Sequence, residues 1–244
     1  MYGEAAGRRL KRSHVAVVGV GGVGSWSAEA LARSGAGCIS LIDFDVIAES
    51  NTNRQIHALG DEYGKIKVEA MADRIRAINP RCVVNAIDHF INPDNVESLL
   101  GKPLDALIDA TDQIQAKAAM IAWCRQNEVL SIVAGAGGGK LDPTALAIAD
   151  LSDVHNDRLL SRLRALLRQQ YGYPTGEGGK SASKPSHMGI TAVYSTQARL
   201  PYTPTSTNGK LNCAGYGSSV CVTASMGFAA AAWVMERLAG GVDR

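Results

Sequence analysis

Apolar residues recur along this chain with two different spacings, and stretches of the two kinds alternate. Short β-branched runs such as residues 14–18 predict buried strands. Longer stretches with apolar residues three and four positions apart, such as residues 25–34, predict helices that bury one face. Strands are predicted at residues 14–18, 38–42, 82–87, 106–109, 130–134 and 190–197. Helices are predicted at residues 25–34, 65–78, 114–127, 157–171 and 219–235.

The alternation of strand and helix predicts the fold class. Parallel strands need crossover connections, and these place helices on both faces of the sheet. We therefore expect an α/β protein with a doubly wound, Rossmann-like, mostly parallel sheet, in which ligands bind at the carboxyl ends of the strands. A single domain is expected over residues 1–244. Residues 10–140 would form the nucleotide-binding core, and residues 141–244 the part that contacts substrate and a second subunit.

Composition narrows the classes of protein. The 244 residues are 46% hydrophobic and 20% charged, which excludes global disorder. A net charge of +2 argues against binding nucleic acid mainly by bulk charge. The five cysteines form no CxxC pair, so a four-thiolate zinc site is not expected. No signal peptide is visible and the Ala-rich stretch 219–235 is expected to be a buried helix, so the protein should be cytoplasmic without a membrane span.

A glycine-rich turn follows the first predicted strand. Its glycines let the backbone approach a phosphate and let a helix start close to the strand, with its N-terminus facing the anion. Asp43 lies 19 residues after Gly24, where a carboxylate can accept hydrogen bonds from both ribose hydroxyls. These features fit a nucleotide or an NAD cofactor equally well. The glycines of the turn are Gly19, Gly21, Gly22 and Gly24.

Further along the chain from Asp43, a group of four residues favours a triphosphate ligand over a dinucleotide. They are Asn51, Arg54, Gln55 and Lys67. A triphosphate that is about to lose pyrophosphate develops charge, which an arginine and a lysine can stabilise. Taken singly, each of these residues would be read as an ordinary surface residue. Together they indicate adenylation rather than redox chemistry.

Five motifs follow one another over about residues 10–140. They are GxGGxG at residues 19–24, Asp43-Phe44-Asp45, SNxxRQ at residues 50–55, GxxK at residues 64–67 and Asp-x-Thr-Asp at residues 109–112. In this combination the chain resembles the ubiquitin-activating-enzyme-like adenylation fold, which includes the bacterial thiamine and molybdopterin sulfur-carrier activators. The resemblance implies ATP with Mg²⁺.

The resemblance also implies a role for each site residue. The four glycines would lie against the nucleotide, and Asp43 would hold the ribose. Arg54 and Lys67 would hold the phosphates, and Asp112 would bind the metal; these three are the expected catalytic residues. Asp45 would assist the metal or the loop after it, and Asn51 and Gln55 would order the site. His57 is expected to pack beneath the nucleotide loop; the alternative is that it acts as a general base.

Several further stretches resemble one branch of this family, the tRNA threonylcarbamoyladenosine dehydratases. That branch implies a homodimer that adenylates the threonine carboxylate of the modified adenosine beside a tRNA anticodon, then closes a ring and releases AMP. An activator of a ubiquitin-like sulfur carrier is the main alternative, although paired CxxC motifs are missing; an NAD-dependent oxidoreductase and a non-catalytic subunit are others. The stretches are residues 21–26, 52–59, 93–96, 137–144 and 213–217.

The second half of the chain leaves more open. Residues 173–187 are rich in glycine, lysine and serine, so a mobile loop is expected there. Cys213 is either a structural thiol at the entry to the last helix or a reactive thiol that meets a sulfur-transfer protein. Arginines on the predicted helix at 157–171 and lysines at 180–184 could bind phosphates or form an ordinary charged surface.

Overall fold

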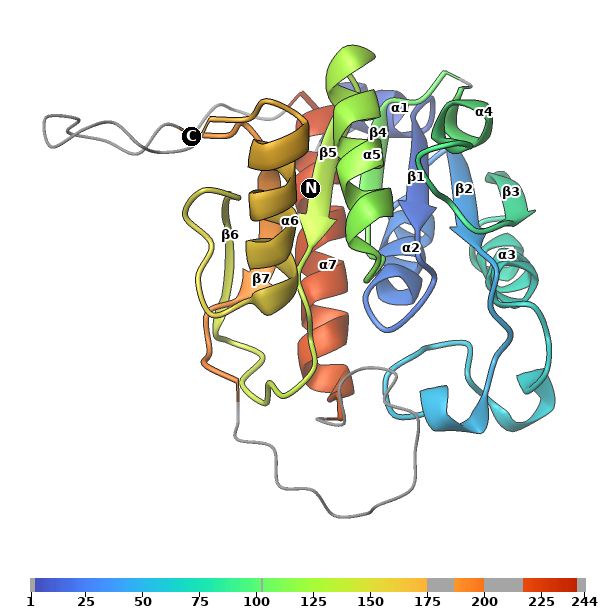
Figure 1. Ribbon diagram of the computed structural model, residues 1–244. Coiled ribbons are helices and arrows are strands. Elements are labelled where there is room, and N and C mark those ends of the chain that lie inside the picture. Colours follow the sequence, from blue (N-terminus) through green and yellow to red (C-terminus); the bar gives the residue numbers. More distant parts are fainter. Residues whose placement is uncertain (1–2, 102, 175–186, 200–216, 241–244) are drawn as a thin grey trace, which may run out of the picture.

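The computed structural model describes residues 3–101, 103–174, 187–199 and 217–240 (Figure 1). In this part of the chain, helices cover both faces of one seven-stranded sheet. The strands are β1 (His14–Val18), β2 (Cys38–Asp43), β3 (Val83–Asp88), β4 (Ala106–Asp109), β5 (Leu130–Ala134), β6 (Leu146–Asp150) and β7 (Thr191–Ser195). The helices are α1 (Gly3–Leu10), α2 (Gly24–Arg33), α3 (Lys67–Ile78), α4 (Val96–Leu100), α5 (Ile114–Gln126), α6 (Arg158–Gln170) and α7 (Val220–Leu238).

The strand order is β3-β2-β1-β4-β5-β7-β6. All neighbouring pairs are parallel except β6 and β7, so only the edge strand β6 runs the other way. Val15 of β1 pairs with Ile39 of β2 on one side and with Ala106 of β4 on the other. The chain therefore reverses its direction of winding between β1 and β4, where doubly wound sheets bind their ligands. The expected fold class is confirmed.

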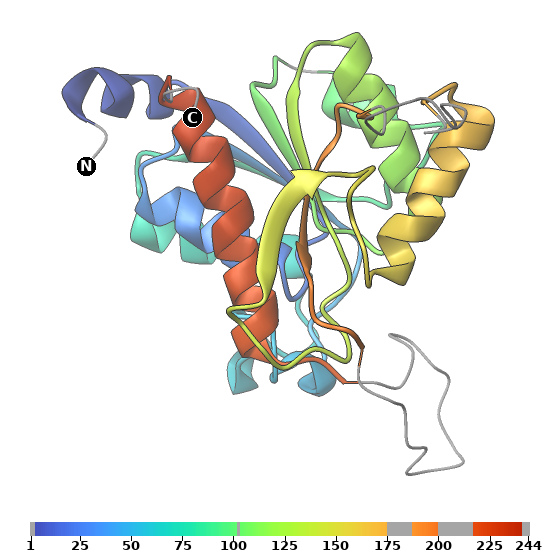
Figure 2. The ribbon, with the colours of Figure 1, turned by 90° about the vertical axis from the view of Figure 1, so that its left-hand side faces the viewer.

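Side chains alternate between two cores, one on each face of the sheet. Val15 and Val17 of β1 pack in the core that α2, α3 and α7 cover. Ala16 and Val18 point the opposite way, into the core beneath α4 and α5. A strand buried on both faces reads as a continuous apolar run, which is why these elements were visible in the sequence. Figure 2 shows the sheet nearly edge-on between its two helical layers.

Neither the edge strand β6 nor the short helix α4 was predicted, and the predicted start of α3 is two residues too early. The edge strand β6 is half-buried without clear alternation, and α4 has only five residues. The third helix begins at Lys67 rather than at residue 65. Its preceding residue, Ile66, has an extended backbone and forms a bridge with Val46. A long-range pairing therefore overrides the local helical pattern.

The Ala-rich segment forms the buried helix α7, as expected. It packs against α2, where the Ser27 hydroxyl donates to the Gly227 carbonyl at 3.0 Å. In the described part of the chain, no helix combines the length and the apolar character that crossing a membrane requires. Residues 175–186, most of the stretch expected to be a mobile loop, lie outside the described residues.

A buried ion pair that the sequence analysis did not anticipate fixes β4 to β5. Lys117 on α5 has no solvent exposure, and its Nζ lies 3.1 Å from Asp109 Oδ1 at the end of β4. The same ammonium donates to the carbonyl oxygens of Asp109 and Ala134. Removing one partner of a buried pair leaves an uncompensated charge in a low-dielectric interior, which is costly.

We predict that Lys117→Met lowers the free energy of unfolding by about 3–5 kcal/mol, because the Asp109 carboxylate then stays buried without its cation. Urea denaturation followed by circular dichroism measures the change. Lys65→Met is the matched control, because Lys65 pairs with Glu62 at the surface and its loss should leave the midpoint nearly unchanged. A Lys117→Met protein as stable as the control would contradict this role.

Candidate nucleotide-binding site

The glycine turn after β1 lies in close contact with the loop after β4. Gly19 has a φ of +83°, and a Cβ there would lie 2.9 Å from the Ala110 carbonyl group and the Thr111 nitrogen. Gly24 faces inward, and a Cβ on it would overlap the Gly19 carbonyl oxygen. Both positions therefore require glycine, and the turn forms one wall of the site where the winding reverses.

The helix that follows the turn presents an open N-terminus. The N-cap of α2 is Val23, whose side chain offers no capping oxygen, and no acidic residue lies in the first turn. A helix start without a cap or a carboxylate keeps its partial positive charge available to an anion. The expectation that Gly19, Gly21, Gly22 and Gly24 frame a phosphate site fits this geometry.

Asp43 ends β2 next to this turn. Its Oδ2 accepts from the Val20 N–H at 2.6 Å and its Oδ1 from the Asp45 N–H at 2.9 Å. Burial raises the pKa of Asp43, while the Lys67 charge and the two backbone donors oppose that rise. The carboxylate is therefore oriented by the backbone, and each oxygen keeps a lone pair with which it can accept a hydroxyl of a ribose.

The segment after β2 brings Arg54 and Gln55 against the glycine turn. A Cβ on Gly22 would lie 3.2 Å from Arg54 Cγ, and one on Gly21 would lie 3.9 Å from Gln55 Nε2. Arg54 Nη1 donates to the Ser50 carbonyl and to Asn53 Oδ1, both at 2.9 Å. The Gln55 Oε1 atom is buried and has no hydrogen-bond partner. An unpaired buried amide oxygen is costly, and a ligand that donates to it would remove that cost.

Asn51 shapes this segment. It is buried at the end of a short 3₁₀ turn (Glu49–Asn51), and its Oδ1 accepts from the Ala48 N–H at 3.0 Å. The Gln55 N–H donates in turn to the Asn51 carbonyl. Asn51 therefore fixes the backbone of this segment, and its role in ordering a nucleotide site stays a prediction.

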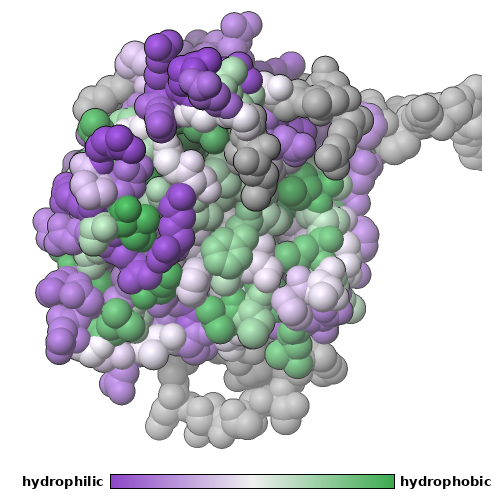
Figure 3. Space-filling model, turned by 180° about the vertical axis from the view of Figure 1, so that it is seen from behind, coloured by the Kyte–Doolittle hydropathy of each residue, from purple (hydrophilic) through white to green (hydrophobic). Residues whose placement is uncertain are grey.

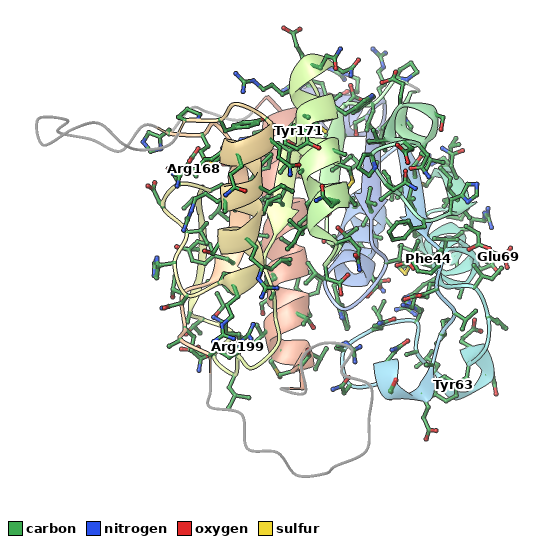
Figure 4. All side chains as sticks on the ribbon, in the orientation of Figure 1. Phe44, Tyr63, Glu69, Arg168, Tyr171 and Arg199 are labelled. Carbon is green, nitrogen blue, oxygen red and sulfur yellow. The ribbon has the colours of Figure 1, made fainter. Side chains whose placement is uncertain are left out.

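Lys67, the first residue of α3, is buried and directed at the acidic end of β2. Its Nζ lies 2.7 Å from Asp45 Oδ2, and Asp45 itself is about half exposed. The Lys67 charge also acts on Asp43. Figure 4 shows Phe44, between these two aspartates, on the same side of the molecule as Tyr63. The cation is thus held at the edge of the sheet by carboxylates that could share it with phosphates.

Asp112 is exposed in the loop after β4, and its Oδ1 accepts from Gln113 Nε2. Asp109 lies behind it, fully buried; its Oδ1 accepts from Thr111, while its Oδ2 has no partner. Among the described residues no group of three or more His, Cys, Asp or Glu side chains could hold a metal ion. Mg²⁺ is commonly bound by one or two carboxylates together with substrate phosphates and water, so a single exposed aspartate here fits the predicted metal role.

The second half of the chain, which was expected to contact substrate, also lies against the glycine turn after β1. Thr223 near the start of α7 lies between the two glycine turns, and a Cβ on Gly137 would come within 2.8 Å of its methyl group. Asn53 Nδ2 donates to the Ser218 carbonyl at 2.9 Å. The start of α7 therefore holds the turn after β5 and the arginine-bearing segment in place.

Lys140 joins three loops on the same edge. It is 2% exposed, and its Nζ donates to the carbonyl oxygens of Asn156, Ser195 and Gln197. Burial lowers the pKa of this ammonium, and nearby Arg199 adds to that effect. In Figure 4, Arg199 and Tyr63 mark opposite sides of the carboxyl edge. Lys140 belongs to the stretch 137–144 that resembles the dehydratase branch, but the sequence did not reveal this role because the partners of Lys140 are backbone atoms.

The cysteines divide into buried and exposed thiols. Burial raises the pKa of Cys82 to about 11 and that of Cys124 to about 12, so both are inert, as expected of structural thiols. Cys221 in the first turn of α7 is exposed. Cys213 lies outside the described residues, so its reactivity and a sulfur-transfer partner stay predictions.

The chain belongs to the ThiF family, whose model matches residues 1–240. The tRNA threonylcarbamoyladenosine dehydratase of Haemophilus influenzae is 43% identical over 94% of this chain and 87% of that protein. Its Escherichia coli counterpart is 41% identical over 98% of this chain and 90% of that protein. The solved E. coli enzyme in complex with ATP matches with a TM-score of 0.86, covering 97% of this chain and 90% of that one; its AMP complex also gives 0.86. The resemblance inferred from the motifs is confirmed.

The His57 side chain is buried, in agreement with the expectation that it packs rather than reacts. It is 2% exposed, and neither ring nitrogen has a hydrogen-bond partner. Burial lowers its pKa from 6.5 to about 4, and the charges of Lys67 and Arg74 act in the same direction. The ring is therefore neutral at physiological pH but a weak base without access to solvent, which argues against the alternative that His57 acts as a base.

We predict that His57 makes the protein sensitive to mild acid. As the pH falls from 6.5 to about 4, the unfolded chain binds a proton at this imidazole and the folded chain does not, so stability is lost in that window. The loss reaches about 3 kcal/mol at 1.36 kcal/mol per pKa unit. Urea midpoints measured across this range should fall less steeply for His57→Gln than for the wild type. The exposed His155→Gln is the control; parallel curves for all three proteins would show that His57 contributes nothing.

Proposed function

We propose that this chain is an ATP-dependent enzyme that modifies tRNA. It adenylates the threonine carboxylate of threonylcarbamoyladenosine, and then closes the modification into a ring with release of AMP. The observation that carries the proposal is the set of charged side chains around the glycine turn. Arg54 lies against Gly22, and Lys67 faces the acidic end of β2, where a dinucleotide would need no such cations. The similarity to the E. coli dehydratase bound to ATP supports the same assignment.

The protein residues bind and orient the nucleotide. The glycine turn and the start of α2 would hold phosphate oxygens, and Asp43 would accept from the ribose hydroxyls. Arg54 and Lys67 would lie against the triphosphate, with Gln55 supplying a free amide oxygen and Asn51 fixing the segment. Asp112 would hold Mg²⁺, which neutralises charge on the departing pyrophosphate when bound. Asp45 would release Lys67 to the phosphates as they bind.

Neither of the two chemical steps requires a nucleophile from the protein. In the first, a carboxylate oxygen of the threonine attacks the α-phosphorus of ATP and pyrophosphate leaves. In the second, an atom of the carbamoyl group attacks the activated acyl carbon, a proton is lost and AMP leaves. The nucleoside thereby loses one water. The site contributes by enclosing the acyl-adenylate, so that the attack within the modification is faster than hydrolysis.

We propose in addition that the enzyme is a homodimer, with contacts from residues 141–244. Phe228 on the outer side of α7 is 45% exposed, Val220 37%, and Ile148 on the edge strand β6 41%. Figure 3 shows apolar residues gathered over this face of the molecule. Large contiguous apolar surface on a folded protein is usually covered by a partner, and a second copy would cover both α7 and the open edge of β6.

The direct test of the activity is incubation with ATP, Mg²⁺ and tRNA that carries threonylcarbamoyladenosine. Mass analysis of the digested nucleosides should show the loss of one water, and AMP should form in equal amount. An unchanged nucleoside despite ATP binding would refute the proposal. Tight NADH binding by calorimetry, with no heat from ATP and Mg²⁺, would favour an oxidoreductase. Dependence of ATP–pyrophosphate exchange on a sulfur-carrier protein would favour a carrier activator.

We predict that Asp112→Ala abolishes AMP formation while leaving the fold intact, because Asp112 is exposed and makes a single side-chain hydrogen bond, to the neighbouring Gln113. AMP release is measured by chromatography, and folding by the thermal midpoint. Asp73→Ala is the control, because Asp73 is an exposed aspartate on α3 that pairs with Arg76. Turnover by the Asp112→Ala variant near the wild-type rate would show that this residue does not hold the metal.

A further inference from the structure

The arginines of α6 form no ion pair with any residue that the structure describes. Several arginines on other helices do have acidic partners: Arg33 and Arg74 both bind Glu29, and Arg76 binds Asp73. The helix α6 itself contains no acidic residue. These arginines are Arg158, Arg162, Arg164 and Arg168.

The helix has one buried face and one polar face. Leu160, Leu163 and Leu167 are fully buried against the sheet, whereas Arg158 and Arg162 are exposed one turn apart. A four-residue step along a helix is about 6 Å, so the two guanidinium groups can reach successive phosphates of one strand. A guanidinium binds phosphate through two parallel N–H donors, which an ammonium cannot do.

The first turn of α6 is attached to the candidate site. Asp157, the N-cap of α6, accepts from the Leu160 N–H through Oδ1 and from the Ala136 N–H through Oδ2 at 2.8 Å. Ala136 lies in the glycine-rich turn after β5, next to the loop after β4 that carries Asp112. Arg158 therefore lies at the carboxyl edge of the sheet, and the other three arginines follow along α6 away from the site.

The remaining arginines are fixed in place along the same helix. Arg164 Nη1 donates to the carbonyl oxygens of Leu151, Ser152 and Val154, and Arg168 Nε donates to that of Pro174. Both retain further N–H groups and their full charge. Figure 4 shows Arg168 and Tyr171 at the end of the helix that lies away from the site edge. The positive charge thus extends over the whole length of α6.

We propose that the polar face of α6 binds the phosphate backbone of the tRNA strand that carries the target adenosine into the site. The proposal rests on the proposed function, because a nucleoside that reacts within tRNA must bring its flanking phosphates past this edge. The overall charge of +2 gives no general attraction for nucleic acid, so affinity has to come from a local cluster of cations such as the arginines of α6. These arginines begin beside the site, where the flanking phosphates would lie.

The test compares Arg158→Gln/Arg162→Gln with the wild type. Fluorescence anisotropy with labelled tRNA should show a dissociation constant raised roughly tenfold for each lost charge-assisted contact. The slope of log K against log salt should become shallower by about 1.4, at 0.7 per phosphate contact with a single strand. The KM for modified tRNA should rise with little change in kcat, and the affinity for ATP should not change. Arg158→Lys/Arg162→Lys should keep most of the salt dependence, because the charge remains.

The matched control is Arg12→Gln/Arg81→Gln, which removes two exposed arginines near the amino ends of β1 and β3. If the α6 variant binds tRNA with the same affinity and salt slope as this control, the α6 proposal is wrong. If the wild type converts the nucleoside and the α6 variant keeps the same KM for tRNA, only this inference fails and the proposed function stands. If the wild type neither binds tRNA nor converts it, both fail. Binding of anionic vesicles or of an acidic protein through α6 in place of tRNA would also overturn the inference.

Discussion

The close approach of the first glycine turn to the loop after β4 is the constraint on which the site depends. The Gly19 N–H donates to the Ile42 carbonyl and the Ala110 N–H to the Val18 carbonyl, so the ends of β1, β2 and β4 are tied together. Only glycine at positions 19 and 24 permits that packing. The same geometry exposes the start of α2 and brings Asp43, Arg54 and Asp112 to one edge of the sheet.

Charge at this edge is arranged in two layers. The inner layer, Asp109 with Lys117, is fully buried and joins β4 to β5 behind the site. The outer layer pairs buried Lys67 with half-exposed Asp45, and leaves Arg54 bound to neutral oxygens. A bound phosphate would therefore contact Lys67 and Arg54 without disturbing the ion pair of Asp109 and Lys117. This separation explains why loss of Lys117 is expected to affect stability, whereas loss of Asp112 is expected to affect turnover.

The second half of the chain completes the site and supplies the surface for a large substrate. Thr223 separates the two glycine turns, and Lys140 fastens the loops after β5, β6 and β7 through backbone carbonyls. From this edge α6 extends with four arginines that form no ion pair with a described residue. The half expected to bind the nucleotide and the half proposed to contact tRNA are thus connected by the start of α7 and by Lys140.

The sequence by itself determined most of the elements, the fold class and the family. Continuous apolar runs mark strands that are buried on both faces, and the order of the glycine, aspartate, arginine and lysine motifs marks the nucleotide edge. The sequence did not determine the edge strand β6, the start of α3 at Lys67 or the roles of Lys117, Lys140 and Thr223. Those depend on backbone partners and on contacts between distant segments, which leave no periodic or spaced signal in the chain. Only the tertiary structure could show which arginines pair with a carboxylate among the described residues, because partners such as Glu29 for Arg74 lie on another helix.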